Sequence, residues 1–190
     1  VIKLEEPQTF ELKNGLKVLV VENHKLPRVS VQLLLDNPPI LEGEKAGVSS
    51  LTGRLLGKGS MNISKDDYND EVDFLGASIN FSGQSAFAST LSRNFTRIIE
   101  LMADAALHPN FSGEEFDKEK ERFIEGLKSD EKNVSAVARR VESALAYGTA
   151  HPNGEFSSIE SIEKVTLEDA KAFYEDFFVP EHAYLVLIGD

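Results

Sequence analysis

Four histidines, with no cysteine, are the residues from which a transition-metal site in this chain would have to be built. They are His24, His108, His151 and His182, and no two are spaced to share one face of a helix. Zinc is held by three or four nitrogen, sulfur or carboxylate ligands. A zinc site would therefore have to be assembled from distant loops, and the spacing favours isolated histidines in loops or on the surface.

The other residues with chemical potential form no recognised motif. The patterns GxGxxG, GxxxxGK(S/T) and GxSxG do not occur, so dinucleotide, P-loop and nucleophile-elbow sites are not predicted. The acidic run from Asp66 to Asp73 carries carboxylates of the kind that calcium prefers, but it lacks the glycine and the terminal glutamate of an EF-hand. Its helical spacing favours a solvated helix face.

Acidic residues outnumber basic ones by 32 to 20, which gives a formal net charge of -12. No basic stripe is available to neutralise phosphates, so nucleic-acid binding is not expected. Hydrophobic residues make up 41% and charged residues 27% of the 190 residues, which is the balance of a globular domain without a membrane span. We interpret residues 1–190 as one domain, or as one half of a larger protein.

Periodicity and turn residues predict an α+β fold, with helices packed on a largely antiparallel or mixed β-sheet. Asn14-Gly15 predicts a two-residue hairpin turn between strands 9–13 and 16–21. Ser112 with Glu115 predicts a capping box at the start of a long charged helix. Further strands are expected over 29–35, 77–82, 85–91 and 183–188, and further helices over 64–76, 94–107, 134–147 and 166–178.

Residues 46–60 predict the helix that the functional interpretation depends on. Apolar residues recur in it at helical spacing, so one side of the helix is apolar. Ser50, Gly53 and Arg54 share a neighbouring polar side. A helix with His, Glu and His at those three places would bind zinc, and this one cannot.

Several short segments, taken in order, give the chain a family resemblance. They are Asn14-Gly15-Leu16-Lys17-Val18, Lys45-Ala46-Gly47-Val48, Gly57-Lys58-Gly59-Ser60, Gly76-Ala77-Ser78-Ile79-Asn80, Glu119 to Leu127, Phe173-Tyr174 to Pro180, and Gly189-Asp190. With these segments the chain resembles the amino-terminal domain of the pitrilysin (insulinase) peptidases, the inverzincins. The resemblance covers nearly the whole of residues 1–190, and it implies a single pitrilysin-like domain from a larger two-domain subunit.

In active members of that family, an HxxEH motif on the first helix supplies two zinc ligands and the general base, and a glutamate on a later helix is the third ligand. The resemblance places Ser50, Gly53 and Arg54 at the His, Glu and His of the motif and Gly126 at the third ligand. An accompanying upstream glutamate is retained as Glu119. The resemblance therefore implies no catalytic residue, no bound metal and no cofactor.

The family also binds extended peptides along an exposed sheet edge, and Asn80 and Phe81 match positions on that edge. The simpler interpretation is that Ile79 and Phe81 alternate in a strand and that Asn80 forms local hydrogen bonds. Lys58, between two glycines, is expected to be a solvated loop residue.

The resemblance implies a non-catalytic subunit that completes a peptide-binding chamber with an HxxEH-bearing subunit of the same family. Two alternatives remain open at this point. One is an active metallopeptidase with an unusual metal site. The other is a purely structural subunit, like the core proteins of respiratory complex III.

Overall fold

A mixed six-stranded sheet forms the centre of the computed structural model, which describes residues 7–190. The strand order is β1-β2-β6-β3-β5-β4, and among the strands of residues 7–190 only the β2–β6 pair is parallel. The strands are β1 (Gln8–Glu11), β2 (Lys17–Glu22), β3 (Arg28–Leu35), β4 (Ser78–Phe81), β5 (Ser85–Leu91) and β6 (Ala183–Gly189). The predicted α+β fold with a mixed sheet is confirmed.

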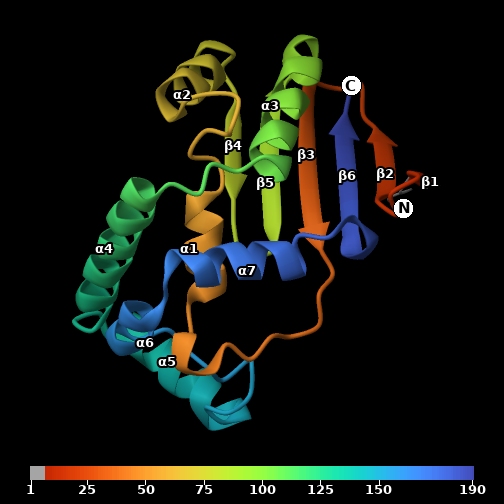
Figure 1. Ribbon diagram of the computed structural model, residues 1–190. Helices are drawn as coiled ribbons and strands as arrows, with labels where there is room; N and C mark the ends of the chain where they lie inside the picture. Colours follow the sequence, from red (N-terminus) through yellow and green to blue (C-terminus); the bar gives the residue numbers. More distant parts are fainter. Residues whose placement is uncertain (1–6) are drawn as a thin grey trace.

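The α-helices lie over one face of the sheet and around one of its ends (Figure 1). They are α1 (Val48–Leu55), α2 (Lys65–Phe74), α3 (Phe95–Leu107), α4 (Gly113–Asp130), α5 (Val134–Tyr147), α6 (Ile159–Lys164) and α7 (Leu167–Phe177). Helix α3 crosses the front of β5 and β3, and α7 runs across the lower end of the strands (Figure 1). Within the described residues, no helix is both long and apolar enough to span a bilayer.

Two apolar clusters hold these layers together. In the first, α3 packs on the sheet through Ile98 and Leu101, which meet Val31 and Ala88. In the second, Leu51 and Leu55 of α1 pack with Phe116 of α4 and Phe173 of α7. Both α1 leucines are almost fully buried, so the second cluster fixes α1 between α4 and α7.

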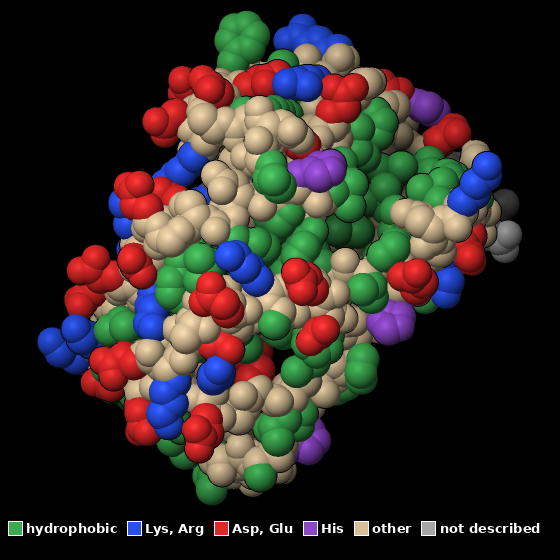
Figure 2. All heavy atoms as spheres, viewed as in Figure 1, with side chains coloured by type: hydrophobic (Ala, Val, Ile, Leu, Met, Phe, Trp, Pro, Cys, Tyr) green, Lys and Arg blue, Asp and Glu red, His purple; other side chains and the backbone are tan. Residues whose placement is uncertain are grey.

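Apolar side chains remain uncovered beside α3, over β3, β6 and β2, whereas charged side chains gather over the helices on the other side (Figure 2). A shallow cavity of about 140 Å³ lies in this apolar area. Its lining includes Leu16, Leu33, Met102, Leu107 and Leu185.

The first hairpin differs from its prediction. Gly15 has φ +85, but no residue other than glycine among the described residues has a positive φ, so Asn14 is not left-handed. Leu12 instead donates to the Leu16 carbonyl and accepts from the Gly15 N–H, which closes a three-residue loop. A three-residue loop needs one left-handed residue, and Gly15 supplies it.

Local capping and helix ends also differ in part. Ser112 accepts from the Glu115 N–H as predicted, but the Glu115 carboxylate pairs with Lys65 at 2.7 Å instead of completing the capping box. The helix predicted over 46–60 is shorter than expected: it begins at Val48 and ends at Leu55. Helix α6 was not predicted, since it has only six residues and its capping box uses Ser161 in place of an acidic residue.

Candidate functional site

The amino-terminal end of α1 is fixed by polar groups. Gly47 precedes the helix at φ +105, and the Glu42 carboxylate accepts hydrogen bonds from the N–H groups of Gly47 and Ser49. The buried Thr52 hydroxyl donates to the Val48 and Ala170 carbonyls. Together with the buried leucines, these contacts set the rotation of α1, so that Ser50 and Arg54 are exposed while Gly53 is buried.

Gly53 lies directly against the turn between β4 and β5. A Cβ atom at this position would lie 2.3 Å from the Ser82 carbonyl carbon and 2.4 Å from the Gly83 nitrogen. From the other side, a Cβ atom at Gly83 would lie 2.5 Å from the Ser49 oxygen. Real Cβ atoms do not approach backbone atoms so closely, so no side chain, and in particular no glutamate, fits at position 53 while this contact persists.

Arg54 occupies the neighbouring position on α1. Its guanidinium carbon lies 4.4 Å from the centroid of the Phe123 ring on α4, which is a cation–π contact. Among residues 7–190, no carboxylate lies within ion-pair distance of Arg54. Gly126, one turn beyond Arg122 on α4, is exposed and has open space where a Cβ atom would be.

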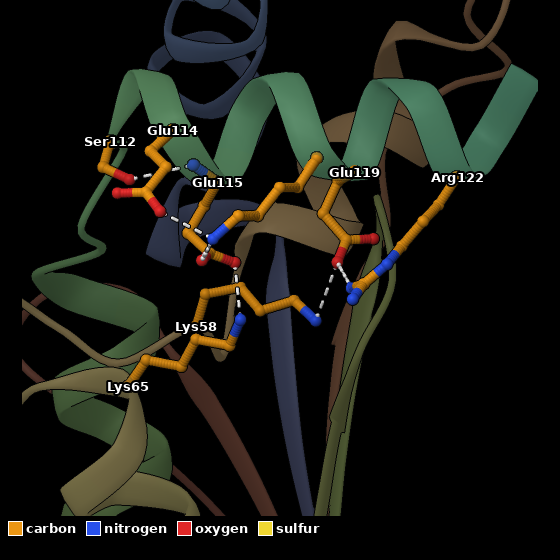
Figure 3. A network of polar contacts seen from close by, with 8 residues as sticks. Lys58, Lys65, Ser112, Glu114, Glu115, Glu119 and Arg122 are labelled. Atoms are coloured by element: carbon orange, nitrogen blue, oxygen red, sulfur yellow. Dashed lines mark hydrogen bonds and ion pairs between the residues drawn. The ribbon is translucent and has the colours of Figure 1, made fainter.

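Glu119 is the buried carboxylate of the site, with 3% of its surface exposed. One of its oxygens, Oε1, lies 3.1 Å from Lys58 Nζ and 2.7 Å from Arg122 Nη1. Figure 3 shows Glu119 and Arg122 projecting from α4 toward Lys58. Burial alone would raise the pKa of Glu119, but hydrogen bonds and charge attraction from Lys58 and Arg122 outweigh burial and hold that pKa below its usual value.

The expectation for Lys58 is therefore wrong, because its side chain is only 27% exposed and forms an ion pair with Glu119. Gly57 and Gly59, with φ +75 and +79, bend the chain on either side of it. A second pair, Lys65 with Glu115, lies beside the first and joins the start of α2 to α4 (Figure 3). The hydrogen bond from Lys65 lowers the pKa of Glu115, and burial opposes it.

A zinc ion does not fit these residues. The positions that the sequence resemblance predicts for the metal ligands and the general base offer a hydroxyl at Ser50, a guanidinium at Arg54 and no side chain at Gly53 and Gly126. The retained Glu119 is engaged by two cations. No group of three or more His, Cys, Asp or Glu within residues 7–190 is placed to hold a metal ion.

The four histidines make separate contacts. His24 lies 2.6 Å from an Asp190 oxygen, and hydrogen bonding to Asp190 and Glu22 raises its pKa. His108 contacts Asp104 at 3.1 Å. His182 lies 3.3 Å from the Asn37 side-chain oxygen, and His151 accepts from the Asn153 N–H.

Asn80 and Phe81 lie on β4, an edge strand of the sheet. Asn80 is exposed, whereas the half-buried Phe81 packs against the first apolar cluster and beside Gly57. The Ser82 N–H donates to the Ser85 carbonyl, so Ser82 is a hydrogen-bonded position of the antiparallel β4–β5 pair. Such positions alternate along a strand, so the backbone N–H and C=O of Asn80, two residues earlier, also point toward β5. Those of Ile79 and Phe81 therefore point away from the sheet, and no backbone hydrogen bond joins them to another segment of residues 7–190.

The profile of the insulinase family, peptidase family M16, matches residues 17–155. The chain belongs to this family. The match includes α1, β4 and α4, so the geometry described above is that of an M16 domain. The resemblance seen in the sequence is thereby confirmed.

Proteins similar to this chain include an inactive peptidase domain, a peptidase subunit and a subunit of the cytochrome b-c1 complex. A crystal structure of an inactive domain of peptidase M16 from Pseudomonas fluorescens has 26% sequence identity and a TM-score of 0.85, over 98% of this chain and 47% of that chain. Mouse mitochondrial-processing peptidase subunit beta is 26% identical over 89% of this chain. Subunit 1 of the bovine cytochrome b-c1 complex is 23% identical over 97% of this chain. This chain spans 36% and 39% of the lengths of these last two relatives.

Gly53→Ala is predicted to destabilise the protein by about 1–3 kcal/mol, because the new methyl group would overpack the backbone at Ser82 and Gly83. Gly126→Ala is the matched control, a glycine in a helix with open space around it. It is expected to stabilise the protein by about 0.5–1 kcal/mol. Urea denaturation of both variants measures the difference. Equal effects would contradict the contact at Gly53.

Lys58→Met is predicted to destabilise the protein by about 1–3 kcal/mol at neutral pH, because the buried Glu119 keeps only one of its two cations. The lowered pKa of Glu119 means that its ion pairs stabilise the fold above the unfolded pKa of about 4.3. That contribution is lost as the pH falls through the folded pKa.

The loss caused by Lys58→Met should accordingly shrink in acid, which urea denaturation across a pH series would show. Lys128→Met, which removes an exposed pair with Glu125, is the control and should change stability little. A loss for Lys58→Met that is the same at every pH would assign the effect to packing and not to the charge of Glu119.

Proposed function

We propose that this M16 domain belongs to a non-catalytic subunit that holds extended peptides and completes a peptide-binding chamber with an HxxEH-bearing subunit. The observation that carries the proposal is the contact at Gly53, where the β4–β5 turn takes the space that the side chain of a general base would need. Loss of the metal ligands at Ser50, Arg54 and Gly126 supports the same conclusion from the chemistry of the donor set.

Peptide binding is proposed for the free edge of β4. Strand addition uses backbone N–H and C=O groups, so it does not require a metal. The outward groups of Ile79 and Phe81 offer such an edge. The Phe81 side chain packs inward beside Gly57, so its part in binding is assigned to its backbone, while Asn80 presents an exposed side chain on the other face of the strand.

The partner and the domain organisation are inferred from relatives. Two of them are named as a subunit of the mitochondrial-processing peptidase and a subunit of the cytochrome b-c1 complex. The chain covers less than half of each, which fits one domain of a longer subunit. We therefore assign the catalytic zinc of the assembly to a separate M16 subunit with an intact HxxEH motif.

The partner prediction concerns activity. An HxxEH-bearing M16 protein from the same organism is expected to lose most of its peptidase activity when it is separated from this subunit and to regain it on mixing. The measurement is cleavage of a fluorogenic peptide, with zinc content determined for each purified protein. Equal cleavage by the HxxEH protein alone would refute the partnership. Stoichiometric zinc in this protein, with chelator-sensitive cleavage, would establish an active peptidase instead.

The edge prediction concerns one backbone group. Ile79→Pro removes an outward N–H without removing a hydrogen bond to β5, so extended peptides are expected to bind about tenfold more weakly. Ile79→Ala is the matched control, because it shortens the side chain but keeps the N–H. Fluorescence anisotropy with a labelled peptide measures both affinities. The same affinity for both variants would remove β4 as the binding edge.

A purely structural role is the second candidate. It is favoured by the similarity of nearly the whole chain to subunit 1 of the cytochrome b-c1 complex. A structural subunit would bind no extended peptide, so the anisotropy measurement on the unchanged protein separates the two candidates.

A further inference from the structure

Cationic side chains from α1, from α4 and from the loop after α1 lie where α1 meets α4. Lys58 and Arg122 pair there with the buried Glu119, and Arg54 lies against the Phe123 ring of the same helix. Lys58 and Arg122 share one oxygen of that carboxylate, and Arg54 has no carboxylate within ion-pair distance among residues 7–190. In a chain with a net charge of -12, an exposed arginine with no ion-pair partner among the described residues is unexpected.

Arg54 is arranged to bind an anion. Its guanidinium carbon lies 4.4 Å from the centroid of the Phe123 ring, and this contact limits the side-chain freedom that binding would otherwise remove. The guanidinium is exposed and carries a planar set of N–H donors. A carboxylate is the anion whose geometry matches that set, because it can accept two parallel hydrogen bonds.

Open space lies next to these cations. Glu119, Arg122 and Gly126 recur at helical spacing, so they lie along one side of α4. The missing side chain at Gly126 leaves room beside Arg122 and the Phe123 ring. An incoming carboxylate therefore has both charge and space available at this junction.

The junction lies at the end of the β4 edge. Gly53, which precedes Arg54, touches Ser82 and Gly83, and a Cβ atom at Gly57 would lie 2.8 Å from the Phe81 ring. This side of α1 therefore runs along the end of β4. A peptide strand paired with Ile79 and Phe81 would lie about 4.8 Å from β4 and pass close to the α1 residues beside it.

We infer that the site selects extended peptides with an acidic side chain, whose carboxylate is bound by Arg54 with support from Arg122. This inference rests on the proposed peptide-binding role of β4 and adds the chemical class of peptide. The negative charge of the whole chain opposes acidic peptides in general, but exposed charges farther apart than about 8 Å are largely screened at physiological salt. The preference is therefore local and applies to one position of the peptide.

The test uses extended peptides of alternating threonine and valine, with a single glutamate scanned through every position, and the same peptides with glutamine in its place. At one position the glutamate peptide is expected to bind the full protein about fivefold more tightly than its glutamine counterpart. Raising the ionic strength should reduce that difference, while binding of the glutamine peptide stays unchanged.

Arg54→Gln is expected to abolish the preference without weakening binding of the glutamine peptide, and Arg54→Lys to restore only part of it. Arg93→Gln is the matched control, because Arg93 is exposed and lies beyond the opposite end of β5. It should leave the preference intact. These variants separate a charge effect at Arg54 from a general change in net charge.

The outcomes distinguish this inference from the function it rests on. Glutamate and glutamine peptides that bind equally at every position would overturn the inference and leave the proposed peptide binding in place. A glutamate preference that persists in Arg54→Gln would also overturn it, because the carboxylate would then be bound elsewhere. Failure of every peptide to bind would overturn the proposed peptide binding together with the inference.

Discussion

The backbone contact between α1 and the β4–β5 turn is the constraint on which the rest of the site depends. Gly53 and Gly83 allow the two segments to approach until backbone meets backbone. Leu51 and Leu55 hold the opposite side of α1 in the apolar cluster with α4 and α7. The helix therefore cannot withdraw to admit a larger residue without loss of buried apolar contact. Packing of α1 on both sides therefore excludes a general-base side chain at position 53.

The charges around Glu119 show how the fold accommodates a buried carboxylate without a metal. Burying an ionised carboxylate is costly unless a positive charge lies beside it. Lys58 and Arg122 supply that charge here, and the lowered pKa of Glu119 shows that their attraction outweighs the effect of burial. Glu119 thus stabilises the fold through one ion pair within α4 and one with the loop that follows α1.

Sequence reasoning succeeded where the signal was local or where residues could be matched in order. Periodicity located α3, α5 and β5, and the segments matched in order predicted the family. It failed where the deciding contact was distant in sequence. Lys58 pairs with Glu119, and Glu115 leaves its own capping box for Lys65, through contacts that no local pattern specifies. The exclusion of a side chain at Gly53 likewise depends on how closely α1 approaches the β4–β5 turn, and no pattern in the sequence specifies that distance.

The position of β6 has a consequence for the order of folding. This strand follows every other described strand in sequence, yet it lies between β2 and β3 and pairs with both. During synthesis, the β1–β2 hairpin therefore has no place in the sheet until residues 183–189 have emerged from the ribosome. Long-range pairing of this kind slows folding, because a long loop must close before its contacts form. Until that step is complete, the exposed edges of β2 and β3 are open to pairing with other chains, so a nascent chain of this domain depends on rapid closure or on a chaperone to avoid aggregation.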